Sequence, residues 1–89
     1  MLATFTGTIA KEPKSGWTCV FWPGSVTLLG TGKPVRVKAS VDSHSFEVTL
    51  MPAGGFHMVP LKAGVRKLLG KQEGDSVEVV IQETVIKKA

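Results

Sequence analysis

One segment late in the chain constrains the fold more than any other, because it joins a short amphipathic helix to a valine-rich strand. Within residues 59–70, four aliphatic side chains recur at i, i+4, i+7 and i+8, which places them on one stripe of a helix. They are Leu61, Val65, Leu68 and Leu69. Pro60 suits the start of this helix, because its missing N–H costs nothing there, and Gly70 suits a left-handed end. The segment predicts one short helix, at about residues 61–69, whose apolar stripe seals an end of the core.

Most of the remaining chain has the composition and the alternation of β-strands. Residues 2–11 alternate threonine with apolar side chains, and residues 76–85 are rich in β-branched side chains. The other strands that we expect are 17–22, 35–41, 46–50 and 56–59. Residues 25–30 fit a strand or a helical turn equally well.

The length of the chain favours a closed arrangement of these strands. A domain of 89 residues buries only roughly 60–65% of its unfolded surface, so the core must be used efficiently. A closed sheet achieves this and leaves no exposed edges. We therefore predict a mainly β fold, namely a small closed or double-split six-stranded β-barrel capped by one short α-helix, with residues 1–89 forming a single domain.

Two registers are open for the hairpin in the middle of the chain. A turn centred on residues 42–43 sets Lys38 opposite Glu47, whereas a turn centred on residues 43–44 sets Lys38 opposite Thr49. Both registers keep the valines of the two strands on one face. The sequence therefore leaves the choice between them open.

Composition limits where such a chain can work. No apolar run approaches the ~20 residues that span a bilayer, and the first residues lack the basic and apolar regions of a signal peptide. Cys19 is the single cysteine, so no internal disulfide can form, and we expect a cytoplasmic, reducing setting. The apolar neighbours of Cys19 indicate a small buried side chain and not a reactive thiol.

Residues that carry common enzyme chemistry are scarce. The chain has no Gly-x-Ser-x-Gly motif, no His-Glu-x-x-His motif and no cysteine pair. His44 and His57 are expected in structural roles, and we expect His57 to hydrogen-bond a backbone group and orient the adjacent Gly-Gly loop. Asp75, which follows a glycine in a turn, is expected to accept backbone N–H bonds. The sequence favours a non-catalytic protein with neither a cofactor nor a metal.

Several short motifs in a fixed order make the chain resemble a known family. They are Trp17 before an aliphatic strand, Gly55-Phe56-His57, Val59-Pro60-Leu61, Val65-Arg66-Lys67-Leu68-Leu69-Gly70, and Glu73-Gly74-Asp75 before a valine strand. The chain resembles, over essentially its whole length, the bacterial and archaeal family catalogued as domain of unknown function nineteen-hundred-and-five. The resemblance implies a small double-split barrel capped by a helix, similar in plan to the swapped-hairpin DNA-binding barrels of transition-state regulators and antitoxins. Ser43 departs from this family, whose hairpin turn usually has glycine.

A non-catalytic binding role is the leading functional hypothesis. The expected helix has a basic rim beside a glycine-rich loop, and fields of this kind attract anionic partners. The candidate ligand-binding residues are Trp17, His57, Lys62 and Arg66. We expect an unidentified small ligand or a protein as the partner, and we expect a monomer, because a barrel that closes within one chain leaves no long strand edge.

Two of these side chains carry local expectations. Trp17 and Trp22 are five residues apart, so on a regular strand they point to opposite faces, and we expect one in the core and the other partly exposed. Arg66 can clamp a phosphate or a carboxylate with its guanidinium fork. Pairing of Arg66 with a nearby acid, Asp75 or Glu73, is the favoured expectation.

Nucleic-acid binding is the alternative hypothesis, by analogy with the similar swapped-hairpin barrels. The residues that would contact phosphates are Arg36, Lys38, Lys62, Arg66 and Lys67. The net charge of +4 is modest for a DNA-binding protein, and the last strand begins with acidic residues.

Overall fold

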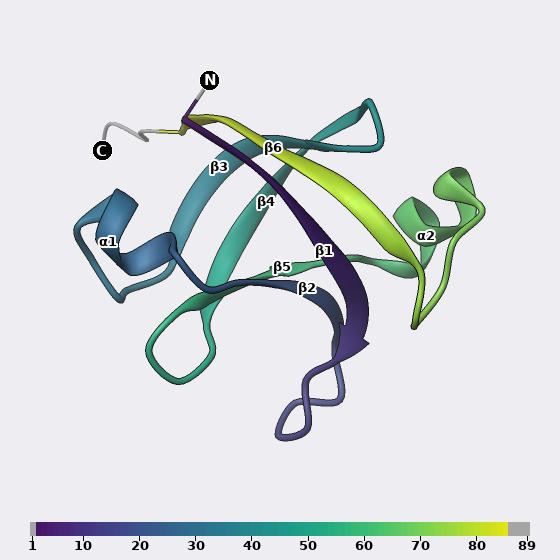
Figure 1. The fold of residues 1–89 in the computed structure, drawn as a ribbon, viewed down its shortest axis with the longest axis horizontal. Helices are drawn as coiled ribbons and strands as arrows, with labels where there is room; N and C mark the ends of the chain where they lie inside the picture. The colour runs from purple at the N-terminus through teal and green to yellow at the C-terminus, as the bar shows by residue number, and fades with distance from the viewer. Residues whose placement is uncertain (1, 86–89) are drawn as a thin grey trace.

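Six antiparallel strands close into a barrel in a computed structural model of the chain, which describes residues 2–85 (Figure 1). The strands are β1 (Ala3–Lys11), β2 (Thr18–Trp22), β3 (Val35–Val41), β4 (His44–Pro52), β5 (His57–Pro60) and β6 (Ser76–Thr84). They follow one another around the barrel in the order β1-β2-β5-β4-β3-β6, and β6 pairs with β1 to close it. The predicted mainly β, closed six-stranded barrel is confirmed.

The alternation of side chains along the strands fills the barrel. In β1, Thr6 and Thr8 face solvent while Phe5 and Ile9 point inward, as their period of two predicts. The fully buried aliphatic side chains of the core include Ile9, Val20, Val37, Ala39, Val41, Leu50, Val59, Val77, Val79 and Ile81. Trp22 joins them and stacks on Phe5, with ring centroids 5.5 Å apart and an angle of 9° between the planes. Trp22 is therefore the core tryptophan, and Trp17 is the exposed one, as expected.

β1 pairs with two neighbouring strands in succession. Residues 3–8 pair with β6, and residues 9–11 pair with β2. Between these partners the chain passes close to the core: a Cβ at Gly7 would lie 2.4 Å from Cγ1 of the fully buried Val20, so no larger residue fits without displacing the core.

The central hairpin adopts the first of the two registers that the sequence allowed. Lys38 lies opposite Glu47, and the two turn residues, Asp42 and Ser43, have φ values of 47° and 73°. Two positive φ values are typical of a type I′ turn, whose twist matches that of the flanking strands.

Two short helices, and not one, accompany the barrel, and Figure 1 shows them at opposite ends of its long dimension. Residues 25–30 form a helical turn, α1 (Ser25–Leu29). The expected helix at 61–69 is α2 (Ala63–Leu69); it starts later than predicted, and Pro60 belongs to β5. Gly70 ends α2 in the left-handed conformation, with φ 66°, as predicted. No helix in the described part of the chain is long and apolar enough to cross a membrane.

The predicted apolar stripe of α2 is wrong at one position. Leu68 is 72% exposed, whereas Val65 and Leu69 pack against the core and Leu61 is buried. Because Leu61 lies in the extended segment before the helix, it does not set the helical face. α2 therefore contacts the core through Val65 and Leu69, and Leu68 faces solvent.

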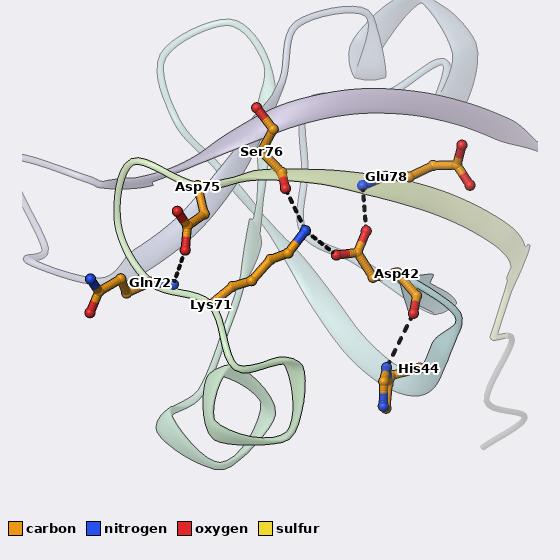
Figure 2. A network of polar contacts seen from close by, with 7 residues as sticks. All are labelled: Asp42, His44, Lys71, Gln72, Asp75, Ser76 and Glu78. Atoms are coloured by element: carbon orange, nitrogen blue, oxygen red, sulfur yellow. Dashed lines mark hydrogen bonds and ion pairs between the residues drawn. The ribbon is translucent and has the colours of Figure 1, made fainter.

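A polar network fixes the end of α2 to the hairpin and to β6 (Figure 2). Lys71 Nζ donates to Ser76 O at 2.8 Å and forms an ion pair with Asp42 Oδ2 at 2.5 Å. Asp42 Oδ1 in turn accepts the N–H of Glu78 at 2.9 Å. The Lys71 ammonium and the Glu78 N–H hold the pKa of the Asp42 carboxyl below its usual value. Asp75 Oδ2 accepts the N–H of Gln72 at 3.0 Å, which confirms the turn role expected for Asp75.

Candidate functional site

An open cleft of about 340 Å³ separates the β1–β2 loop from the start of α2. It is lined by Gly16, Trp17, Thr18, Pro60, Leu61, Lys62 and Arg66. We call it the Trp17–Arg66 cleft. Three of the four predicted ligand-binding residues, Trp17, Lys62 and Arg66, meet in it, and the fourth, His57, does not.

Backbone hydrogen bonds hold the floor and one wall of the Trp17–Arg66 cleft in place. Leu61 N donates to Thr18 O at 2.9 Å, which continues the β2–β5 ladder beyond Pro60. Glu12 N donates to Trp17 O at 2.8 Å, and Trp17 N donates to the Ser15 hydroxyl at 3.2 Å. The backbone of Trp17 is thereby fixed while its side chain stays 48% exposed.

The rim of the Trp17–Arg66 cleft carries two cations. Arg66 Nε donates to Leu61 O at 3.2 Å, which orients the guanidinium, and its two terminal nitrogens have no hydrogen-bond partner in the described part of the chain. The expected ion pair of Arg66 with Asp75 or Glu73 is wrong. Within residues 2–85 the ion pairs are Arg36–Glu47 and Lys71–Asp42, so neither Lys62 nor Arg66 has an acidic partner there.

His57 lies apart from this cleft, in the wall of the barrel. Its side chain is fully buried, and its Nε2 lies 2.8 Å from Lys33 O, an acceptor to which it must donate. The Ser25 hydroxyl accepts the backbone N–H of His57 at 2.7 Å and donates to its Nδ1, also at 2.7 Å. His57 therefore hydrogen-bonds a backbone group as expected, but it anchors α1 and the loop before β3, and not the Gly-Gly loop.

The other chemically interesting side chains are engaged in structure. Cys19 is fully buried, and burial, with a smaller contribution from the charge of Glu12, raises its pKa to about 11. A thiol of that kind stays protonated and unreactive near neutral pH. His44 Nδ1 donates to Asp42 O at 3.2 Å in the hairpin turn. Within residues 2–85 no group of three or more His, Cys, Asp or Glu side chains could hold a metal ion.

Acidic residues lie among the cations proposed for nucleic-acid binding. Arg36 forms an ion pair with Glu47 at 3.7 Å and donates to the Thr49 hydroxyl at 3.1 Å. Lys38 lies opposite Glu47 on one side and Glu83 on the other. The remaining three cations belong to α2 and its N-cap, Lys62. The five side chains thus fall into two groups on different elements, one of them partly neutralised.

Sequence reasoning missed a second cleft, which Trp17 also lines. It measures about 360 Å³, and we call it the methionine cleft. Its lining residues are Glu12, Lys14, Ser15, Trp17, Met51, Pro52, Ala53, Gly54 and Met58. The composition of β2 pointed to an apolar region outside the barrel. This strand is apolar on both faces, so its outward face needs apolar side chains to cover it.

Comparison with known proteins gives a family but no characterised relative. A family model described as "Domain of unknown function (DUF1905)" matches residues 5–81, which is most of the chain. A search of curated proteins found no match.

Proposed function

This chain belongs to the DUF1905 family of domains of unknown function, and from that premise we propose that it is a non-catalytic binding module. Its ligand is a small anion with a flat apolar body, held in the Trp17–Arg66 cleft. The carboxylate or phosphate of the ligand contacts Lys62 and Arg66, and its apolar part packs on the indole of Trp17.

The observation that carries this proposal is a pair of cations, without acidic partners among residues 2–85, beside an exposed indole. Arg66 has no acidic partner among the described residues, so no carboxylate there competes with a ligand for its guanidinium. Its terminal nitrogens form the planar fork that binds a carboxylate or a phosphate through two parallel hydrogen bonds. The floor below, Pro60 and Leu61, is apolar, as in most small-molecule sites.

The lining of the cleft supports binding and not catalysis. None of its described lining residues is a histidine, a cysteine or a carboxylate, so the cleft offers no group suited to proton transfer near neutral pH. The Thr18 hydroxyl and the Lys62 amine are the candidate nucleophiles among its described lining residues, and neither has a base beside it in the cleft to activate it.

Titration of the isotope-labelled protein with benzoate, followed by NMR, tests the proposal. We expect benzoate to shift the Trp17 indole N–H and the amides of Lys62 and Arg66. Benzamide, which has the same shape without the charge, should shift them far less. Arg66→Gln should weaken benzoate binding about tenfold or more, equivalent to about 1.4 kcal/mol, because the charged fork is lost.

Lys67→Gln is the matched control, since it removes one cation from the same helix outside the cleft. It should leave benzoate binding within about twofold of the original. Equal shifts with benzoate and benzamide, or equal losses in the two variants, would contradict the proposal. A parallel titration with duplex DNA in low salt tests the alternative, and shifts at Arg36 and Lys38 would favour it.

A further inference from the structure

The barrel has a second, smaller apolar layer on its outside. Val20 and Val59 point into the core, so by alternation Cys19 and Met58 point outward, yet Cys19 is 0% and Met58 4% exposed. Met51 pairs with Met58 across β4 and β5. Cys19 and Met58 are thus covered by other parts of the chain, so this outer face of the sheet is an apolar layer and not a solvent-facing surface.

The methionine cleft opens over this outer layer and shares a wall with the Trp17–Arg66 cleft. Trp17 lines both clefts, so the two adjoin at this residue. Methionine side chains are unbranched and polarisable, and they adapt to apolar groups of different shapes. The methionine cleft therefore suits an apolar side chain, whereas the Trp17–Arg66 cleft suits an anion.

The charges around the pair of clefts favour an acidic occupant. Lys14 lies at the methionine cleft, and Lys62 and Arg66 lie at the other. The one acid among the lining residues is Glu12, and its Oε1 already accepts the N–H groups of Lys14 at 3.0 Å and Ser15 at 2.7 Å. Three cations thus lie at the groove with a single acid, one oxygen of which accepts two backbone N–H groups.

We infer that the two clefts act as one groove for an extended peptide segment of a protein partner. An apolar side chain of the segment fills the methionine cleft, and an acidic side chain reaches Arg66 and Lys62. In an extended chain, residues i and i+2 point to the same face about 6–7 Å apart, so the shortest pattern that presents both side chains to two adjoining clefts is an apolar and an acidic residue separated by one residue. This inference rests on the proposed anion site in the Trp17–Arg66 cleft and adds to it the class of partner.

Capped synthetic peptides test the inference by calorimetry and NMR on the whole chain. The probes are acetyl-Ser-Leu-Ser-Glu-Ser-amide and the reversed order, acetyl-Ser-Glu-Ser-Leu-Ser-amide. We expect one of them to bind at least tenfold more tightly than benzoate, with shifts at Met51, Met58 and Arg66 together. Replacing its leucine by serine, or its glutamate by glutamine, should each weaken binding several-fold. Moving the glutamate next to the leucine should do the same, because adjacent side chains point to opposite faces.

A protein variant separates the two clefts. Met51→Gln should weaken peptide binding several-fold while benzoate binding stays unchanged, because Met51 lines only the methionine cleft of the two. Leu28→Gln, which makes the same kind of change at an exposed residue of α1, should affect neither ligand. Benzoate binding without any gain from either peptide would overturn the inference and leave the proposed function standing. Absence of both benzoate and peptide binding would overturn both.

Discussion

Two residues of the β3–β4 turn show how backbone and side chain are combined in this fold. Asp42 and Ser43 adopt the positive φ values of a type I′ turn without the glycine that such turns favour. Asp42 offsets this strain through its backbone N–H, which donates to Glu78 O at 2.9 Å, and through its carboxylate. The carboxylate of Asp42 extends the pairing of β3 with β6 by one residue beyond the last strand pair, Val41 with Val79.

The loss of stability of the protein at low pH should depend on Asp42. Its pKa is lowered in the folded protein by Lys71 first and by the N–H of Glu78 second, so its stabilising effect is present above the unfolded pKa of about 4. That effect is lost as the pH falls through the lower, folded pKa. In urea denaturation from pH 7 down to pH 2.5, Asp42→Asn should be less stable than the original protein at pH 7 and should lose less stability on acidification.

Lys71→Gln provides the control for this interpretation. It removes the larger cause of the lowered pKa and keeps Asp42 itself, so this variant should also lose less stability than the original protein on acidification. If the free energies of unfolding of Asp42→Asn and of the original protein change in parallel with pH across this range, the pKa of Asp42 does not differ between the folded and unfolded states.

At the scale of the element, α2 is attached to the barrel by one narrow edge. None of its residues is fully buried, and Val65 and Leu69 make its apolar contacts with the core. The network around Lys71 holds the end of the helix from outside. α2 therefore closes little of the barrel, and it positions Arg66 at the cleft.

Two leucine truncations test this attachment. Leu68→Ala should change the free energy of unfolding by less than about 0.5 kcal/mol, because Leu68 is 72% exposed. Leu69→Ala, one residue further on, should cost about 1–3 kcal/mol, less than the 2–5 kcal/mol of a fully buried leucine, because Leu69 is half-buried. Chemical denaturation measures both. A Leu68→Ala variant as unstable as Leu69→Ala would show that Leu68 also packs against the barrel, contrary to this description.

At the scale of the whole molecule, the barrel closes within one chain, which favours a monomer. Each strand of the described chain pairs with two neighbours, so no complete strand edge is left for a second copy. Sedimentation equilibrium across micromolar concentrations should give a mass near 9.5 kDa. A mass twice as large at every concentration would indicate an exchanged hairpin or another permanent interface.

Strand alternation and glycine positions made most of this barrel predictable. The threonines of β1, the valines of β3 and β4, and Gly70 each behaved as their local pattern indicated. What failed depended on tertiary contacts that local spacing does not contain. Leu68 was misplaced because the start of α2 is decided by the pairing of Leu61 with Thr18, and His57 was misplaced because its partner, Ser25, lies in a helix that the sequence left undecided.

The pairing of β1 with β6 also determines when the molecule can fold. Phe5 lies opposite Val79, and β6 fills the space between β1 and β3. During synthesis, β1 and β3 therefore each keep one unpaired edge until β6 has been made, and β6 completes the barrel. Contacts between residues so far apart in sequence slow folding, so a barrel of this kind is expected to fold in milliseconds to seconds. Until β6 has paired, the open edges of β1 and β3 are places where another chain can add a strand.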